Sequence, residues 1–529
     1  MSSLTKQERW LMWSSILVGV VWILYRLLAS TGWILDDEIS HYLFSKSAWE
    51  NSDQIFNHWT RPGRNLLHCL AAPFGFTATR VFTLVLALLS VWVTFKVGRL
   101  LKVRLLWTVP MMLMYQSWFP ELSYPVLTQT PFMLFWILGV WLALTNRWHL
   151  AGFCFGYLSL IRHEGILLTA AWGLWLTFSE GGFGRQFILL LRKEVQPSSL
   201  LPKLGRDALY GLSTVSAIIL YNLAALLLNG TFPFSVYFES KPTTMYGSGT
   251  IYHYVPLLVN GVGLVSFALS VLGFYSIRKN LGDWSIILVT YPLYFILHAL
   301  IFWKGAFASG GYYHFLMPMA PFAALLSAEG LSFLFGNGRL RWRKILVIAL
   351  TGLVVFQGFN MAHHQLNYQN WQAIHHGDEQ PDFGLTAKPM TKGELNKKVT
   401  EASHWALNHY PEGTAIIAKH VTHNFTQQTL ITKERERIEN VALYAMPVGT
   451  VFIWDRIYCD HENRIKHSSF HDSQDWQKVK SWKLDYPVEG ELAKDQFAVI
   501  IFEKVSELDS SDKVYAELGE SDKYDKAYD

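Results

Sequence analysis

The sequence predicts an α-helical polytopic membrane protein that carries a small α/β domain outside the membrane at its C-terminal end. Of its 529 residues, 51% are hydrophobic and only 16% are charged, whereas soluble globular proteins contain about 25% charged residues. Apolar stretches long enough to cross a bilayer recur as far as residue 361, and the composition becomes polar from residue 362. We therefore expect a membrane domain over 1–361, an extracytoplasmic α/β domain over 362–506 and an acidic, flexible tail over 507–529.

About eleven apolar stretches are predicted to form transmembrane helices. They cover residues 11–29, 78–95, 105–119, 125–144, 148–161, 165–178, 208–228, 254–277, 284–303, 313–335 and 345–361. Lys and Arg concentrate in alternate connections, such as Lys102 and Arg104 after the second stretch and Arg341 and Arg343 after the tenth. Because these residues accumulate on the cytoplasmic side of membranes, we expect a cytoplasmic N-terminus and an extracytoplasmic C-terminus.

The polar C-terminal region shows the patterns of a mixed fold. Residues 413–420, 449–456 and 496–505 are short segments rich in β-branched and aromatic residues, which predicts strands. Residues 393–410 place apolar side chains at helical spacing. The three cysteines are far apart and odd in number, which indicates neither a disulfide framework nor a zinc site. The net charge of +4 is spread over the predicted cytoplasmic loops and indicates contact with membrane lipids rather than nucleic acid.

Three consecutive carboxylates, Asp36, Asp37 and Glu38, follow the first apolar stretch and precede an amphipathic segment. A helix N-terminus favours one such residue as a cap and others through the helix dipole. Capping needs only one carboxylate, however, and additional ones repel each other beside a low-dielectric membrane unless a cation or a protonatable group faces them. The cluster is therefore a candidate site at the membrane surface.

Further polar residues fall on the same predicted side of the membrane. They are His41, His58, Trp59, Arg61, Arg64, Glu121, Arg162, His163, Glu164, Lys304, Tyr312, Tyr313 and His314. Some have simpler explanations: Arg162 and Glu164 can form a local ion pair, Lys304 can extend to the interface, and Trp59 can anchor the protein there. Convergence of carboxylates, arginines and histidines from several external loops nevertheless favours a site.

These motifs resemble the GT-C class of integral-membrane glycosyltransferases. The similarity rests on "LDDEISHYL" in the first external loop, on Glu121 in the next, and on "YPVLTQTPFMLFWILGVWLAL", "GYLSLIRHEGILLTAAWGLWL" and "YYHFLMPMAPFAALLSAEGL". Within the class, the first loop is most similar to that of lipid-linked mannosyltransferases and of protein O-mannosyltransferase-like enzymes. Gln129 and His314 depart from the pattern, because related proteins often have an acid and an arginine there.

The resemblance implies an inverting transfer of mannose or another hexose from a polyprenyl-phosphate donor to a hydroxyl of a lipid, glycan or protein acceptor. The reaction would take place on the extracytoplasmic face. Asp37 is the expected base that accepts the hydroxyl proton, with Asp36 as the alternative.

The remaining residues are assigned to three expected groups. The donor phosphate would be bound by Arg61, Arg64, Arg162, Lys304 and His314. The sugar or acceptor would meet Glu38, His41, His58, Trp59, Tyr312, Tyr313 and Glu164. Glu121 and Asp36 could hold Mg²⁺ or Mn²⁺ through oxygen ligands, although the cationic side chains could neutralise the phosphate without a metal.

Two other functions are compatible with a polytopic membrane protein. A secondary transporter binds its substrate near the middle of the membrane, commonly between inverted repeats, but no such repeat is apparent and the charges lie at one face. A non-catalytic scaffold is the second alternative. The lack of paired cysteines favours a bacterial inner membrane, whereas the sequons at Asn229 and Asn424 are compatible with the endoplasmic reticulum.

Overall fold

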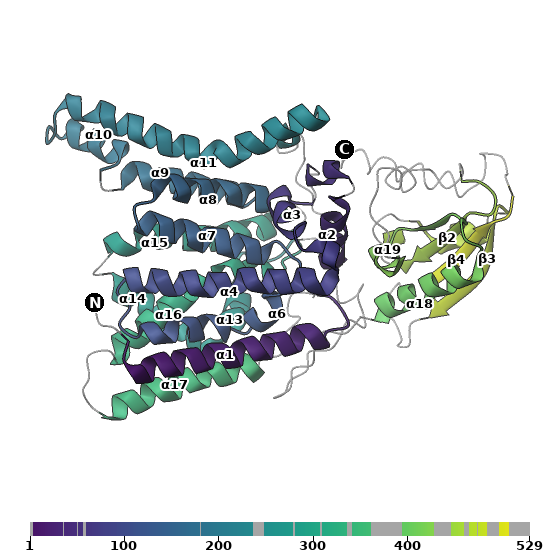
Figure 1. The fold of residues 1–529 in the computed structure, drawn as a ribbon, viewed down its shortest axis with the longest axis horizontal. Helices are drawn as coiled ribbons and strands as arrows, with labels where there is room; N and C mark the ends of the chain where they lie inside the picture. Colours follow the sequence, from purple (N-terminus) through teal and green to yellow (C-terminus); the bar gives the residue numbers. More distant parts are fainter. Residues whose placement is uncertain are drawn as a thin grey trace.

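The computed structural model has a helical membrane domain and, beyond one end of its helices, a small α/β domain (Figure 1). It describes residues 4–34, 36–49, 51–56, 60–179, 181–235, 248–278, 281–306, 309–335, 341–360, 394–427, 446–456, 458–459, 465–472, 474–483 and 497–506. The N-terminal end of the first helix and the α/β domain lie at opposite ends of the helical layer. Which end is cytoplasmic stays a prediction.

Each predicted apolar stretch contains helix. The longer helices are α1 (Lys6–Ala29), α4 (Phe76–Leu100), α7 (Gln129–Leu144), α8 (Trp148–Ile161), α9 (Gly165–Phe178), α11 (Leu200–Asn229), α14 (Leu264–Ile277), α15 (Leu281–Lys304), α16 (Ala320–Phe335) and α17 (Arg341–Asn360). The shorter α10 (Phe183–Leu191) and α13 (Tyr254–Val262) precede α11 and α14. Within the described residues, five helical segments are long and apolar enough to cross a membrane, or six with the bent pair α13 and α14. The predicted count of about eleven crossings is not confirmed.

Two predicted stretches are not continuous helices. Residues 254–277 bend by 104° between α13 and α14. Gly263 sits at the bend with a φ of +88°, which side chains rarely adopt. Residues 105–119 form only η3 (Leu106–Thr108) and α5 (Val109–Met114), and α6 (Phe119–Leu122) begins at their end. Pro110 and Pro120 stand at the starts of α5 and α6, where proline is tolerated because it needs no backbone donor.

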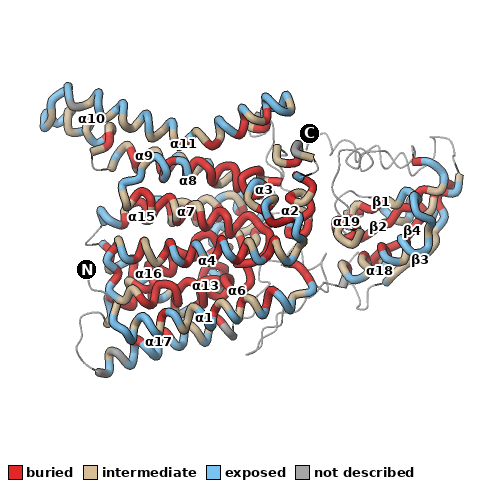
Figure 2. The backbone as a smooth tube through the Cα atoms, viewed as in Figure 1, coloured by how far each residue is buried: buried red, intermediate tan, exposed pale blue. Residues whose placement is uncertain are grey.

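Exposed residues line the outer helices α1, α11 and α17, and buried residues fill the inner ones (Figure 2). Many of the exposed residues are large and apolar. Trp136 and Trp172 are fully buried between helices, whereas Trp10 on α1 is 69% exposed and Leu227 on α11 is 74% exposed. Soluble proteins rarely expose apolar surfaces of such extent. The exposed apolar faces of α1 and α11 therefore identify the surface that meets lipid.

Helices α14 and α16 approach so closely that glycine is needed on both sides. A Cβ added to Gly273 would lie 1.9 Å from the Leu326 carbonyl oxygen, and one added to Gly330 would lie 1.9 Å from that of Leu269. Small residues that allow helix backbones to touch are typical of membrane helix interfaces. These two glycines therefore set the distance between the helices.

The connection between α1 and α4 lies across the ends of the membrane helices, next to the α/β domain (Figure 1). It contains α2 (Asp36–Ser47), η1 (Ser52–Ile55), α3 (Pro62–His68) and η2 (Ala72–Phe74). A further short helix, η5 (Pro233–Ser235), follows α11, and η6 (Tyr313–Met319) directly precedes α16. The end of the layer that carries α2 thus contains most of the polar residues singled out in the sequence.

The α/β domain contains a four-stranded sheet. Its elements are α18 (Glu394–His409), β1 (Ile416–Ala418), α19 (Val421–Gln427), β2 (Val451–Asp455), α21 (His467–Asp472), β3 (Trp476–Lys483) and β4 (Phe497–Lys504). The strand order is β1-β2-β4-β3, with β1 parallel to β2 and the other pairs antiparallel. Along β2, Val451 and Ile453 pack in one apolar cluster, together with residues of α18, and Phe452 and Trp454 pack in another, as alternation requires. The three predicted strands and the predicted helix are confirmed, whereas β3 was not predicted.

Replacing Gly273 by Val should destabilise the membrane domain. The added side chain overlaps the backbone of α16, and such overpacking costs about 1–3 kcal/mol. A lowered midpoint of thermal unfolding in detergent would show it. Gly352→Val on α17 is the matched control, because nothing lies within 4 Å of its added Cβ. Equal midpoints for the two variants would contradict the close approach.

Candidate active site

The first turn of α2 points its three carboxylates in different directions. Successive residues of an α-helix are rotated by about 100°, since one turn takes 3.6 residues. Asp36, Asp37 and Glu38 therefore meet different neighbours, although they are adjacent in sequence. Their environments assign each a different role.

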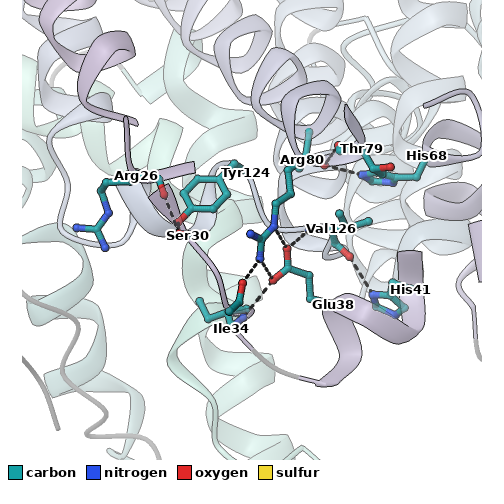
Figure 3. A network of polar contacts seen from close by, with 12 residues as sticks. Arg26, Ser30, Ile34, Glu38, His41, His68, Thr79, Arg80, Tyr124 and Val126 are labelled. Carbon is teal, nitrogen blue, oxygen red and sulfur yellow. Dashed lines mark hydrogen bonds and ion pairs between the residues drawn. The ribbon is translucent and has the colours of Figure 1, made fainter. Parts of the chain in front are cut away.

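Glu38 is committed to a buried ion pair with Arg80 of α4 (Figure 3). Its oxygens accept hydrogen bonds from Arg80 Nε at 2.7 Å and Nη2 at 2.9 Å. The backbone N–H groups of Ile34 and Val126 donate to the same carboxylate at 3.1 and 3.2 Å. Each oxygen thus has two protein donors. The structure shows that Glu38 joins α2 to α4 and to the segment before α7. Its expected contact with the sugar or acceptor stays a prediction.

Asp36 connects α2 to the α/β domain. Its Oδ1 accepts a hydrogen bond from Trp33 Nε1 at 3.1 Å, and its Oδ2 accepts one from the Tyr458 hydroxyl at 3.1 Å. The Nε2 atom of His420 lies 3.8 Å from the same Oδ2. Both oxygens therefore face protein groups.

Asp37 differs from both neighbours, because no described residue donates a hydrogen bond to it. The residue keeps a solvent-exposed surface while protein surrounds it at longer range. This desolvation, followed by the negative charge of Asp36, raises the pKa of the Asp37 carboxyl. Arg61, Arg162 and Arg64 act in the opposite direction. Asp37 is thus an accessible carboxylate with raised basicity, facing cationic groups.

Arg61 and Arg162 come from different loops and share this environment. Arg61 has a φ of +59° at the start of α3, and its Nη1 lies 2.5 Å from Nε2 of His163. Arg162 donates to Glu164 at 2.7 and 3.2 Å and to the Thr128 hydroxyl at 2.8 Å. The α1–α4 connection and the α8–α9 connection therefore meet beside α2. The sequence alternative of an ion pair between Arg162 and Glu164 is confirmed, and it lies next to Asp37 rather than apart from it.

Arg64 and His41 have structural partners within the protein, and their expected ligand contacts stay predictions. Arg64 is completely buried and donates to the carbonyls of Thr60 and His41 and to the Ser45 hydroxyl. His41 Nδ1 donates to the Val126 carbonyl at 3.3 Å. Burial and the Arg64 cation lower the pKa of His41 well below its usual value. Arg64 therefore ties α2 to α3, and its positive charge reaches Asp37 only at longer range.

The structure adds His298, which sequence reasoning missed. Its Nε2 lies 3.6 Å from Glu164, its ring stacks on Phe315, and neither nitrogen has a hydrogen-bond partner in the described part of the chain. His314 is buried nearby, with its ring 4.6 Å from that of Phe315. His298 lies inside the apolar stretch 284–303. The only sequence signal for it is that an ionisable residue within a membrane helix is rare and often functional.

Three other expected residues have surroundings that show no contact with Asp37, and two more lie outside the described residues. Lys304 is exposed, with its ammonium 4.0 Å from the Trp303 ring, as expected for an interfacial residue. Tyr312 packs against the apolar cluster of the α/β domain, and Tyr313 is buried. His58 and Trp59 lie outside the described residues.

Glu121 forms a buried ion pair with Arg26, with Arg26 Nη2 at 2.5 Å from its Oε1. Because Asp36 is engaged with Trp33 and Tyr458, the two expected metal ligands have separate partners. In the described ranges, no group of three or more His, Cys, Asp or Glu side chains could hold a metal ion. That Glu121 and Asp36 hold Mg²⁺ or Mn²⁺ stays a prediction.

The arrangement of helices defines a GT-C fold, the membrane architecture of a class of glycosyltransferases. No protein-family model and no curated protein matches the chain. Among solved structures, the chain is similar to ArnT from Cupriavidus metallidurans in the apo state, with a TM-score of 0.55, 9% identity and coverage of 92% of this chain and 96% of that one.

A second ArnT structure from Cupriavidus metallidurans, bound to undecaprenyl phosphate, gives a TM-score of 0.55 and 11% identity over 93% of this chain and 97% of that chain. The arabinofuranosyltransferase AftD from Mycobacteria is also found, with a TM-score of 0.45 and 13% identity over 97% of this chain and 40% of that one. At these identities, the likeness to ArnT establishes the fold. The chemistry has to be argued from the residues.

Substitutions in the first turn of α2 should separate the structural carboxylate from the accessible one. Glu38→Gln removes the charge from a buried ion pair, and breaking such a pair costs about 3–5 kcal/mol. Asp37→Asn should not lower stability, because a raised folded-state pKa means that the fold disfavours the ionised carboxylate above its unfolded-state pKa. Thermal unfolding in detergent measures both, with the exposed Glu401→Gln on α18 as control. A larger loss for Asp37→Asn than for Glu38→Gln would contradict the assignment.

Proposed function

We propose that the protein is a membrane glycosyltransferase that moves a sugar from a polyprenyl-phosphate donor to a hydroxyl acceptor. The observation that carries this proposal is Asp37, a carboxylate that accepts no hydrogen bond from the described residues. It faces Arg61, at the start of α3 in the same connection, and Arg162, from the α8–α9 connection. The GT-C fold supports it, and the undecaprenyl phosphate bound to ArnT in one related structure supports the donor class.

The proposed reaction makes two chemical demands that this site meets. As the acceptor oxygen attacks the anomeric carbon, Asp37 accepts the hydroxyl proton, and a raised pKa suits a general base. The bond between the anomeric carbon and the phosphate oxygen breaks, and polyprenyl phosphate leaves as an anion. Cationic groups stabilise that charge where it develops. A single displacement of this kind inverts the anomeric centre, and a phosphate leaving group needs no second carboxylic acid to protonate it.

Arg61 and Arg162 are the proposed contacts of the donor phosphate. Arg162 is held by Glu164 and Thr128 and lies with its guanidinium carbon 4.6 Å from the Phe315 ring, so its position is fixed before a donor binds. Arg61 is half-buried at the start of α3. Planar guanidinium groups suit phosphate oxygens because they donate in pairs. His298 and His314 lie beside Arg162, because both rings contact Phe315, over which the Arg162 guanidinium lies.

The position of the site suits a donor with a lipid tail and a polar head. Asp37 lies at the end of the helical layer, where α2 crosses the ends of the helices, while the exposed apolar faces of α1 and α11 meet lipid. A polyprenyl chain can therefore stay in the bilayer as its phosphate and sugar reach α2. A transporter would instead need its charges near the middle of the membrane.

The finer assignments are also proposals. We propose a hexose, with mannose as the first donor to test, and a lipid, glycan or protein hydroxyl as acceptor. We place the reaction on the extracytoplasmic face of a bacterial inner membrane, with the endoplasmic reticulum as the alternative. A divalent cation is proposed only as a companion of the donor phosphate, because the carboxylates expected to hold it have protein partners.

Asp37→Asn should abolish sugar transfer while the protein remains folded. The amide cannot accept the acceptor proton, and loss of a general base costs about 10²–10⁴-fold in rate. Transfer from polyprenyl-phosphate hexoses by the purified protein, with Mg²⁺ and with EDTA, measures the effect. Glu401→Gln serves as control. Transfer by Asp37→Asn at the wild-type rate would remove Asp37 as the base.

On the acid side of the pH profile, kcat/KM should begin to fall at a pH above the usual pKa of an aspartate. Asp37 acts only when deprotonated, and its raised pKa means that kcat/KM rises with pH through a value above about 4. Below that value, the rate should fall tenfold per pH unit. Measurement of kcat/KM from pH 4 to pH 9 checks this, and a flat profile down to pH 4 would contradict a raised pKa at the base.

A further inference from the structure

We propose that the α/β domain supplies two positioning residues, His420 and Tyr458, which hold Asp36 so that its neighbour Asp37 remains the reacting carboxylate. This inference rests on the proposed transfer reaction. It assigns the domain a part in the chemistry beyond covering the site. The contacts that carry it join residues 422 positions apart in the chain.

Both residues come from one edge of the sheet. His420 follows β1 and Tyr458 follows β2, and because these strands are parallel neighbours their C-terminal ends lie side by side. Side chains placed at the carboxyl ends of neighbouring parallel strands converge on common partners. Tyr458 is fixed further, since its backbone N–H donates to the buried Asp455 at 2.7 Å. The sheet therefore presents both groups as a unit.

The orientation of His420 is set by a hydrogen bond on its other nitrogen. The backbone N–H of Thr422 donates to His420 Nδ1 at 3.2 Å, so in the neutral ring the proton is on Nε2. That nitrogen faces Asp36 Oδ2 at 3.8 Å, beyond hydrogen-bond distance, and has no hydrogen-bond partner in the described part of the chain, while the ring is only 1% exposed. Its centre lies 4.8 Å from that of the Tyr458 ring, edge to face. A polar N–H is thus held in a buried place beside a carboxylate.

An apolar contact holds the domain against α2. Phe425 of α19 lies with its ring 5.3 Å from that of Trp33, 5.2 Å from Phe76 and 6.1 Å from Tyr42. Val421 belongs to the same cluster. Buried aromatic pairs contribute to stability beyond their area. The polar contacts to Asp36 therefore need not supply the docking energy, and their loss can be tested without detaching the domain.

The consequence for catalysis follows from repulsion between adjacent carboxylates. Asp36 and Asp37 share one helical turn, and two nearby carboxylates do not both act as free bases. Hydrogen bonds from Trp33 and Tyr458 occupy both oxygens of Asp36 and fix its rotamer. The acceptor proton is then left to Asp37. This arrangement distinguishes the two aspartates, which the sequence left as alternatives.

The test removes the polar atoms and keeps the apolar contact. In the full-length protein, Tyr458→Phe deletes the hydroxyl, His420→Leu deletes the ring N–H, and His420→Gln can return an amide N–H near the Nε2 position. The matched control is Tyr410→Phe, which deletes another hydroxyl of the same domain, one that donates to Glu503 at 3.0 Å. For each variant, kcat and the donor KM are measured along with hydrogen exchange of α2 and α19.

We expect Tyr458→Phe to lower kcat about tenfold, the scale of a hydrogen bond to a charged group. His420→Leu should lower kcat by a smaller factor, because its ring N–H faces Asp36 from beyond hydrogen-bond distance. The donor KM and the protection of α2 and α19 from exchange should stay at wild-type values. His420→Gln should recover most of the rate lost in His420→Leu, and Tyr410→Phe should behave as wild type.

Other outcomes would overturn the inference. Equal kcat for Tyr458→Phe and Tyr410→Phe would show that the hydroxyl does not position Asp36. A lower rate accompanied by lost protection of α2 would assign the contact to docking alone. A wild-type protein without transfer from any lipid-linked sugar would overturn the proposed function itself, and the positioning role with it.

Discussion

The buried ion pair between Glu38 and Arg80 is the interaction on which the arrangement of the site depends. It fastens the first turn of α2 to α4, and its other two bonds reach the backbone at Ile34 and Val126. A charged pair is stable in such a place only when hydrogen bonds satisfy it fully, as they do here. Because α2 is fixed at this point, the directions of Asp36 and Asp37 are fixed as well.

Helix geometry then divides three adjacent carboxylates among three tasks. Glu38 faces the membrane helices, Asp36 faces the α/β domain, and Asp37 faces Arg61 at the start of α3 and Arg162 in the α8–α9 connection. The carboxylate with the fewest protein donors is the one with raised basicity, since desolvation without hydrogen bonds disfavours charge. Structural and chemical roles can therefore be separated by counting donors, although all three residues look alike in the sequence.

The membrane domain and the α/β domain meet over this same turn. Phe425 of α19 packs against Trp33, Tyr42 and Phe76. Beside this apolar cluster, Tyr458 and His420, which follow β2 and β1, face Asp36. An interface of this kind makes the site depend on both domains. It also places the exposed surface of Asp37 at the boundary between lipid and water, where a donor with an apolar tail and a charged head would present its reacting carbon.

The sequence by itself determined the membrane character, the positions of the apolar helices, three of the four strands and the acidic cluster on α2, because hydropathy and periodicity are local properties of the chain. It could not give the bend at Gly263, which depends on a backbone angle, or the commitment of Glu38, Arg64 and Glu121, whose partners are distant in sequence. His298 and His420 entered the site only through tertiary contacts. Residues distant in sequence decide which polar side chains are hydrogen-bonded within the protein and which remain available to a ligand. The sequence alone does not show which distant residues become neighbours.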